Sequence, residues 1–172
     1  MPQPITSPGG AYRAFPKHVL ERPKLAALLG AIAAQWGFVD RSLLDIFERA
    51  TSKSFHRDEV ATTIFDTLGA QGPKLDLIER MIELRLPDET KKKWKAIRKM
   101  IRDRSGERNP LIHGAWNISD AHPHELILLK VSGQAILYTE RDFVEILDRV
   151  VELSNSVNDF VIEVANAKKT DP

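Results

Sequence analysis

The residues of this sequence that are best suited to chemistry lie in the decapeptide ERNPLIHGAW, residues 107–116. Arg108 is followed directly by Asn109, and His113 comes four residues later. An arginine side chain stays charged and its planar fork fits two phosphate oxygens. A histidine, with an unperturbed pKa of about 6.5, can take up and release protons near neutrality. Such a pair could cleave RNA without a metal: the 2′-hydroxyl attacks the phosphate, the histidine moves protons and the arginine stabilises the added negative charge.

An arginine followed by a histidine at this range is common by chance, and the sequence holds two further pairs, Arg13 with His18 and Arg49 with His56. Three features distinguish the pair in the decapeptide. An asparagine follows its arginine, a long amphipathic pattern precedes it, and the most basic segment of the chain adjoins it. Residues 88–108 carry nine basic and four acidic side chains, a net charge of +5, whereas the whole chain has a net charge of +1.

The pattern Arg108-Asn109-x3-His113 resembles the Arg-x(4–6)-His motif of the HEPN superfamily, whose commonest form has Asn after Arg. The resemblance covers the motif and the helical pattern of about residues 22–166. The family contains metal-independent endoribonucleases of toxin–antitoxin systems, phage defence and RNA processing, and also members that have lost catalysis. The resemblance implies catalytic roles for Arg108, Asn109 and His113, no metal or other cofactor, RNA as substrate, two motifs that meet across a homodimer, and an inhibitory partner protein.

Two arguments from the residues agree with a second copy in the site. If residues 108–113 are helical, the five-residue step places Arg108 and His113 about 140° apart around the helix axis. A turn at Asn109-Pro110 or a second chain would bring them closer. One histidine also cannot be acid and base at the same moment, whereas a symmetric dimer supplies two.

Each residue of the motif also has a purely structural interpretation. His113 could be a capping or core histidine bonded to the backbone, and Asn109 a turn or cap residue rather than one that orients Arg108 or His113 or contacts phosphate. Trp116 could stack on a base, although core packing is favoured for it.

The basic segment has two interpretations as well. It could be a solvated helix face that pairs with the acidic C-terminal part of the chain, or a surface that faces phosphate. Under the second interpretation, four cations would guide the RNA backbone: Lys95, Lys99, Arg102 and Arg104.

Apolar residues recur at steps of three and four along much of the chain, which predicts helices. Ser105-Gly106 is expected to end the basic helix, and Thr139-Glu-Arg-Asp142 forms a capping box that opens the last one. The period changes over residues 125–139, where a β-hairpin is predicted. The predicted helices cover residues 22–50, 56–68, 75–86, 88–104 and 139–166, with a further short helix possible within 107–116; the second and third are either separate or one kinked helix.

The fold class expected from these elements is all-α: a four- to five-helix HEPN-like bundle with a small β-hairpin before the last helix. Residues 1–20 hold four of the ten prolines and are expected to form an extended arm. Residues 21–168 are expected to form a single HEPN-like helical domain.

Composition excludes several other classes of function. The 172 residues contain no cysteine, which excludes disulfides, Cys-ligated zinc, iron–sulfur clusters and thiol catalysis. His122-Pro123-His124 lacks evident further ligands and is expected in a surface loop, so no metal site is predicted. No uncharged run approaches the roughly 20 residues of a membrane span, and the first residues lack the apolar core of a signal peptide. A cytoplasmic protein without membrane association is expected.

Three functional hypotheses result. The first is a metal-independent endoribonuclease of HEPN type with a composite site across a homodimer, acting in a toxin or defence system. The second is a non-catalytic HEPN-like module that binds RNA or protein. The third is a DNA-binding regulator that uses residues 88–104, which is disfavoured because that helix carries an apolar stripe with Trp94 and has no clear helix-turn-helix partner.

Overall fold

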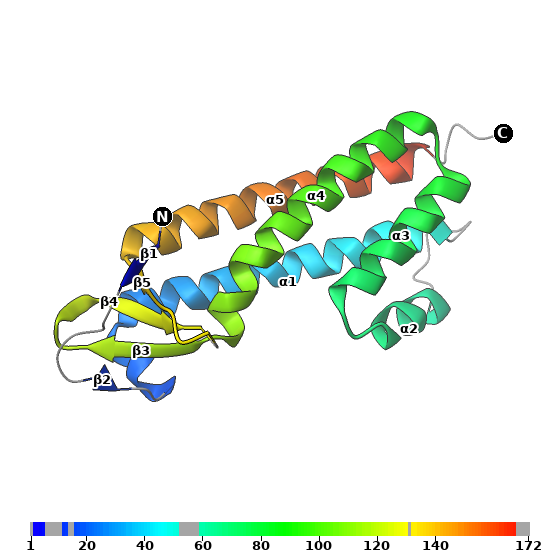
Figure 1. Cartoon of the computed structure of the whole chain (residues 1–172). Helices are drawn as coiled ribbons and strands as arrows, with labels where there is room; N and C mark the ends of the chain where they lie inside the picture. The colour runs from blue at the N-terminus through cyan, green and yellow to red at the C-terminus, as the bar shows by residue number, and fades with distance from the viewer. Residues whose placement is uncertain (1, 6–11, 14–15, 52–58, 131, 168–172) are drawn as a thin grey trace. The chain divides into compact units, whose positions relative to one another are not determined.

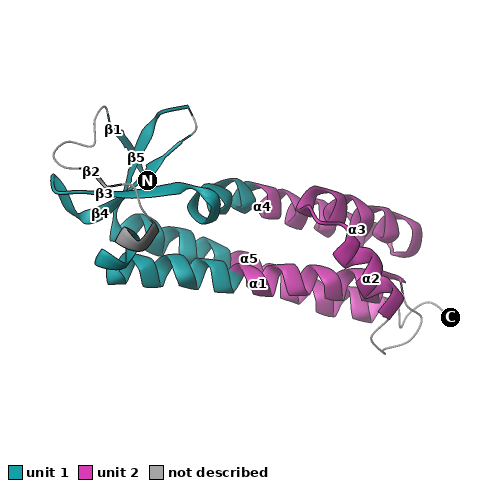
Figure 2. Ribbon diagram, turned by 90° about the horizontal axis from the view of Figure 1, so that it is seen from below, with its two compact units in different colours: residues 1–35, 103–151 teal, residues 36–102, 152–172 magenta. Residues whose placement is uncertain are grey.

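The structure is a computed structural model, which describes residues 2–5, 12–13, 16–51, 59–130 and 132–167 (Figure 1). The chain divides into two compact units (Figure 2). Unit 1 comprises residues 1–35 and 103–151, and unit 2 comprises residues 36–102 and 152–172. The motif of residues 108–113 therefore belongs to unit 1.

Helices account for most of the described residues, as the sequence pattern predicts. The helices are the 3-10 helix η1 (Pro16–Glu21), α1 (Pro23–Thr51), α2 (Glu59–Thr67), α3 (Gln71–Arg85), α4 (Asp88–His113) and α5 (Glu140–Ala167). The strands are β1 (Gln3–Ile5), β2 (Tyr12–Arg13), β3 (Ala115–Ser119), β4 (His122–Leu129) and β5 (Ala135–Tyr138). The structure resolves the open alternative in favour of two helices, α2 and α3; the predicted start of the first of them, at His56, lies outside the described residues.

The predicted β-hairpin is present in unit 1 as β4 and β5. The two strands pair in antiparallel fashion, with Leu126 opposite Tyr138 and Leu129 opposite Ala135. Gly133 in the connecting turn has a φ of 81°, in the left-handed region that glycine adopts without steric cost. The turn that closes the hairpin thus contains a glycine, a residue by which turns can be recognised in a sequence.

The sheet of unit 1 is larger than the predicted hairpin. In the described part of the chain it has five strands in the order β1-β5-β4-β3-β2. The arm supplies both edges, since β1 pairs with β5 and β2 pairs with β3. Short strands of two and three residues carry little signal in a sequence, because their only support is the neighbouring strand.

An aromatic cluster forms part of the core of unit 1. The rings of Trp116, Tyr138 and Phe143 lie with their centroids 5.3 to 5.6 Å apart. The capping box at the start of α5 is also confirmed, because Asp142 accepts from the backbone N–H of Thr139 at 2.9 Å and from its hydroxyl at 2.7 Å. These contacts anchor the first turn of α5 beside the sheet.

Unit 2 is helical, and stacked aromatic rings link its elements. Phe47 of α1 stacks on Phe65 of α2 with the centroids 5.6 Å apart, and Trp94 of α4 stacks on Phe160 of α5 at 5.7 Å. All four rings are buried. Pairs of this kind stabilise a core beyond the area that they bury.

The buried face of α2 differs from the predicted one. The sequence pattern groups Val60, Ile64 and Leu68, but the helix buries Ala61 and Phe65 instead. Val60 is 68% exposed and Ile64 is 47% exposed. The larger ring of Phe65 determines which side packs, because burying an aromatic side chain removes more apolar area from water than burying a valine.

The end of α4 is the main correction to the sequence-based prediction. The helix was expected to stop at Ser105-Gly106, but it continues through these residues and through Pro110 to His113. Continuation as a helix accompanies the burial of Ser105 and Leu111. Tertiary packing of this kind routinely outweighs the local preference of a glycine or proline.

None of the helices, within the residues described, is both long enough and apolar enough to cross a membrane.

Candidate active site

The motif occupies the last turns of α4, directly before β3. Asn109 and His113 are exposed, and Arg108 is half-buried. His113 is the last residue of the helix. The histidine therefore lies at the C-terminal end of the helix.

The structure places Arg108 and Asn109 in direct contact. Nη1 of Arg108 donates to Oδ1 of Asn109 at 3.1 Å. Asn109 lies inside α4, so its interpretation as a turn or cap residue is wrong. Its amide oxygen holds the guanidinium, which is one of the two orienting roles predicted for it.

Arg108 and His113 do not share one helix face. Both lie in α4, and five residues of helix turn the second side chain about 140° from the first. The alternative of a turn at Asn109-Pro110 is wrong, because that dipeptide is helical. Within one chain the helix therefore directs the imidazole of His113 and the guanidinium of Arg108 to different sides.

Trp116 is part of the core and has no exposed face for a base. The residue is 8% exposed, its ring contacts those of Tyr138 and Phe143, and its Nε1 donates to the carbonyl oxygen of Leu111 at 2.7 Å. The prediction that lists Trp116 among RNA-binding residues is corrected, and the favoured interpretation of core packing is confirmed. The indole thereby ties β3 to the last turn of α4.

Gly114 links His113 to β3 in a confined space. A Cβ at this position would overlap the carbonyl oxygen of Pro110 and the side chain of Leu128. Overlap with a backbone atom cannot be relieved by rotating a side chain, so the turn requires glycine.

The predicted RNA-guiding cations differ in their surroundings. Lys95, Lys99 and Arg102 are exposed, and Arg102 Nη2 lies 4.0 Å from a carboxylate oxygen of Asp76. Arg104 is less accessible and donates to Glu107 at 2.8 Å. Arg104 thus serves a contact within unit 1, and the other three expose more of their side chains.

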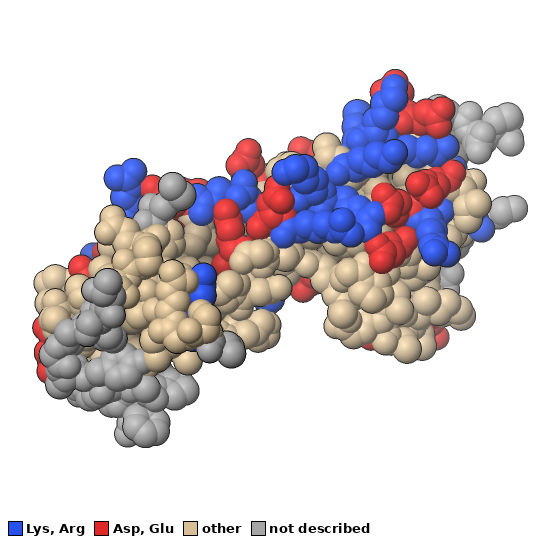
Figure 3. Space-filling view, in the orientation of Figure 1, with Lys and Arg blue, Asp and Glu red and all other residues tan. Residues whose placement is uncertain are grey.

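Figure 3 shows the Lys and Arg side chains gathered over α4, with acidic side chains between them. Several cations of this helix are paired with carboxylates: Lys91 with Asp88 at 2.9 Å, Lys92 with Glu89 at 3.4 Å, Lys93 with Glu163 at 2.8 Å, and Arg98 with both Asp76 and Glu79. Charge pairing thus accounts for part of the basic segment. The exposed pairs among them, such as Lys92 with Glu89, contribute little to stability.

The exposed positions of α4 follow the spacing of one helix face. In unit 2 they include Lys92, Lys95, Lys99 and Arg102, and in unit 1 they include Gly106, Asn109 and His113. Within each unit, successive members are three or four residues apart, the spacing of neighbours on a helix surface. Because the helix does not stop at Gly106, the motif belongs to the same helix as the basic residues.

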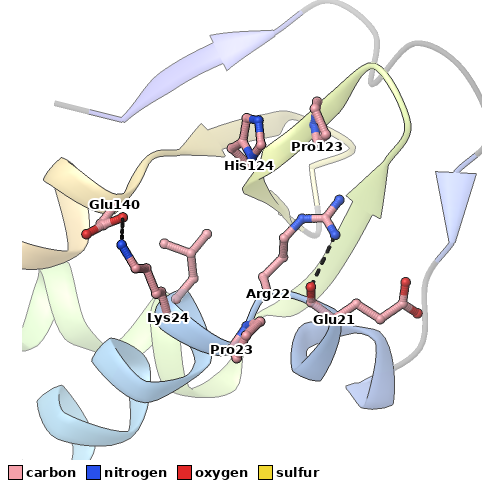
Figure 4. Close-up of a pocket in the computed structure, with 8 residues that line it drawn as sticks. Glu21, Arg22, Pro23, Lys24, Pro123, His124 and Glu140 are labelled. Atoms are coloured by element: carbon pink, nitrogen blue, oxygen red, sulfur yellow. Dashed lines mark hydrogen bonds and ion pairs between the residues drawn. The ribbon is translucent and has the colours of Figure 1, made fainter.

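A pocket of about 390 Å³ lies elsewhere in unit 1 (Figure 4). Its cations have partners: Arg22 Nη1 donates to the carbonyl oxygen of Glu21 at 3.3 Å, and Lys24 Nζ lies 3.7 Å from a carboxylate oxygen of Glu140. The pocket is lined by Glu21, Arg22, Pro23, Lys24, Leu25, Pro123, His124 and Glu140. No residue of the motif lines it, so it is not the predicted site.

The His122-Pro123-His124 segment begins β4 and is not a loop, which corrects the prediction. His124 is exposed at the rim of the pocket. Among the residues that the structure describes, no group of three or more His, Asp or Glu side chains is placed to hold a metal ion.

Comparison of the chain with models of known protein families, with curated protein sequences and with solved structures gives no match.

Proposed function

We propose that this chain is a metal-independent endoribonuclease of HEPN type. The observation that carries the proposal is the end of α4 in unit 1, where the helix exposes Asn109 and His113 and where Arg108 donates to Asn109 at 3.1 Å. In unit 2 the same helix exposes Lys95, Lys99 and Arg102, and cations at successive turns can track a phosphate backbone.

The chemistry assigns one role to each residue of the motif. His113 takes the proton from the 2′-hydroxyl, whose oxygen attacks the adjacent phosphorus. A second histidine gives a proton to the departing 5′-oxygen, which leaves a 2′,3′-cyclic phosphate. Arg108 stabilises the extra negative charge on the phosphate oxygens, and Asn109 orients Arg108 through the contact at 3.1 Å.

A homodimer is part of the proposal because one chain supplies only half of this chemistry. The helix separates Arg108 from His113 by about 140°, and the motif has a single histidine. A two-fold axis beside the end of α4 would bring two of each residue together. We further propose that such an activity, in a toxin or defence system, is restrained by a partner protein.

The test is cleavage of a labelled, structured RNA in EDTA by wild type and by the variants His113→Ala and Arg108→Ala. We expect only wild type to cut, with 2′,3′-cyclic phosphate ends and a loss of at least about 10²-fold in each variant. His124→Ala is the matched control, since it removes another exposed histidine of unit 1 and should cut like wild type.

The outcomes separate the alternatives. Equal cleavage by all variants would remove His113 from the mechanism and point to a contaminating nuclease. Absence of cleavage by clean wild type, with RNA binding that weakens as salt increases, would favour the non-catalytic RNA-binding module.

A further inference from the structure

Glu107 lies directly before Arg108 in the sequence and is not itself part of the motif. Each oxygen of its carboxylate accepts one hydrogen bond: Oε1 from Arg104 Nη1 at 2.8 Å and Oε2 from Arg149 Nε at 3.1 Å. Arg104 lies one turn earlier in α4, and Arg149 lies in α5. The three side chains are between 26% and 34% exposed, so the contacts are partly shielded from water.

Glu107 lies in a turn of α4 that lacks one of the usual backbone hydrogen bonds. Pro110 lies inside α4 and has no N–H to donate to the carbonyl of Gly106, four residues earlier. The residue before a proline is also disfavoured in a helix. The side-chain bridge from Glu107 to α5 therefore supports the helix at the turn that carries Arg108 and Asn109.

The charges around Glu107 argue against a simple electrostatic role of its carboxylate in RNA binding. Arg104 and Arg149 donate to the two oxygens of one carboxylate, and the cation of Arg108 follows directly in the sequence. Neutralising Glu107 would make the group more positive and would by itself strengthen the attraction of phosphate. A loss of activity in such a variant would thus come from geometry and not from weaker RNA binding.

We infer that Glu107, held by Arg149, is a positioning residue that fixes the turn of α4 from which Arg108 reaches the scissile phosphate. The inference rests on the proposed function. A small displacement of a group that must meet the transition state can cost up to about 10²-fold in rate. Glu107 touches no substrate itself and acts only through Arg108.

The experiment compares Glu107→Gln, Arg149→Ala and the double variant in steady-state cleavage of a fluorogenic RNA. We expect kcat to fall at least about tenfold, with KM unchanged or lower, in each single variant. The double variant should lose no more than the worse single variant, because both break the same contact. Arg149→Lys, which keeps a cation, should recover part of the lost kcat.

A matched control is available on α1. Arg41 Nη2 lies 3.0 Å from Asp45 Oδ1, an arginine–carboxylate contact whose carboxylate side chain is 31% exposed, close to the 34% of Glu107. Asp45→Asn should leave kcat and KM as in wild type. Unchanged kcat in Glu107→Gln, or losses that simply multiply in the double variant, would overturn the inference.

A readout that does not depend on cleavage separates this inference from the proposed function. In ¹H–¹⁵N spectra, the side-chain amide signals of Asn109 should shift in Glu107→Gln and Arg149→Ala and stay in place in Asp45→Asn. Unmoved signals would show that Glu107 does not position the turn, even if wild type cuts RNA. Shifted signals in a protein that cuts no RNA would retain the structural role and reject the nuclease.

Discussion

At the residue scale, the candidate histidine is constrained more tightly by its neighbours than by contacts of its own. Trp116 donates to Leu111 before it, and Gly114 after it fits only without a Cβ. The two constraints fix where the exposed side chain of His113 can lie. For the proposed nuclease, such a support would keep His113 in place without burying it.

Gly114 offers a direct test of this constraint. We expect Gly114→Ala to lower the free energy of unfolding by about 1–3 kcal/mol, because the new methyl group overpacks against the backbone of Pro110. Urea denaturation measures the change. Gly106→Ala is the control: nothing lies within 4 Å of its Cβ position, and alanine favours a helix by up to about 1 kcal/mol. Equal stability of the two variants would contradict the proposed confinement.

At the element scale, the start of α5 carries a capping box that can be identified from the sequence alone. Burial works to raise the pKa of the Asp142 carboxyl, but hydrogen bonds that include those from the Thr139 N–H and hydroxyl lower it below its ordinary value. An acid with a lowered pKa in the folded state contributes stability above its unfolded pKa of about 3.9. That contribution disappears as the pH falls through the folded pKa.

The capping box therefore predicts a pH-dependent effect of Asp142→Asn. We expect the variant to be less stable than wild type at pH 7 by about 0.5–2 kcal/mol, the usual contribution of a cap. The difference should shrink as the pH falls from the unfolded pKa of about 3.9 through the lower folded pKa, where the wild-type carboxyl becomes protonated. Urea denaturation between pH 7 and pH 3 measures it, with the exposed Asp148→Asn of the same helix as control. A difference that stayed constant over this range would contradict the role of the charge.

At the scale of the whole molecule, the proposed activity requires two chains. The single motif of one chain lies at the end of one helix, and the helix directs Arg108 and His113 to different sides. Dimerisation would thus be a condition of catalysis and not only of stability. Activity per chain should fall on dilution below the dimer dissociation constant.

A subunit-mixing experiment tests this requirement. We expect a tenfold excess of the double variant Arg108→Ala/His113→Ala to reduce wild-type cleavage at saturating RNA by roughly tenfold, since most wild-type chains would enter mixed dimers. An equal excess of albumin should have no effect. Unchanged cleavage, together with a monomeric mass by light scattering at tens of micromolar, would refute the composite site.

The sequence by itself determined the helices, the hairpin of β4 and β5, and the motif, because each has a local signal. Helical periodicity, the turn at Gly133 and the capping box each depend on residues that lie close together in the sequence. The end of α4, the strands of the arm, the buried face of α2 and the bridge from Glu107 to Arg149 were decided only by the tertiary structure. The physical reason is the same in each case. Each feature depends on partners distant in the chain, and burial, strand pairing or charge pairing with them outweighs the local conformational preference.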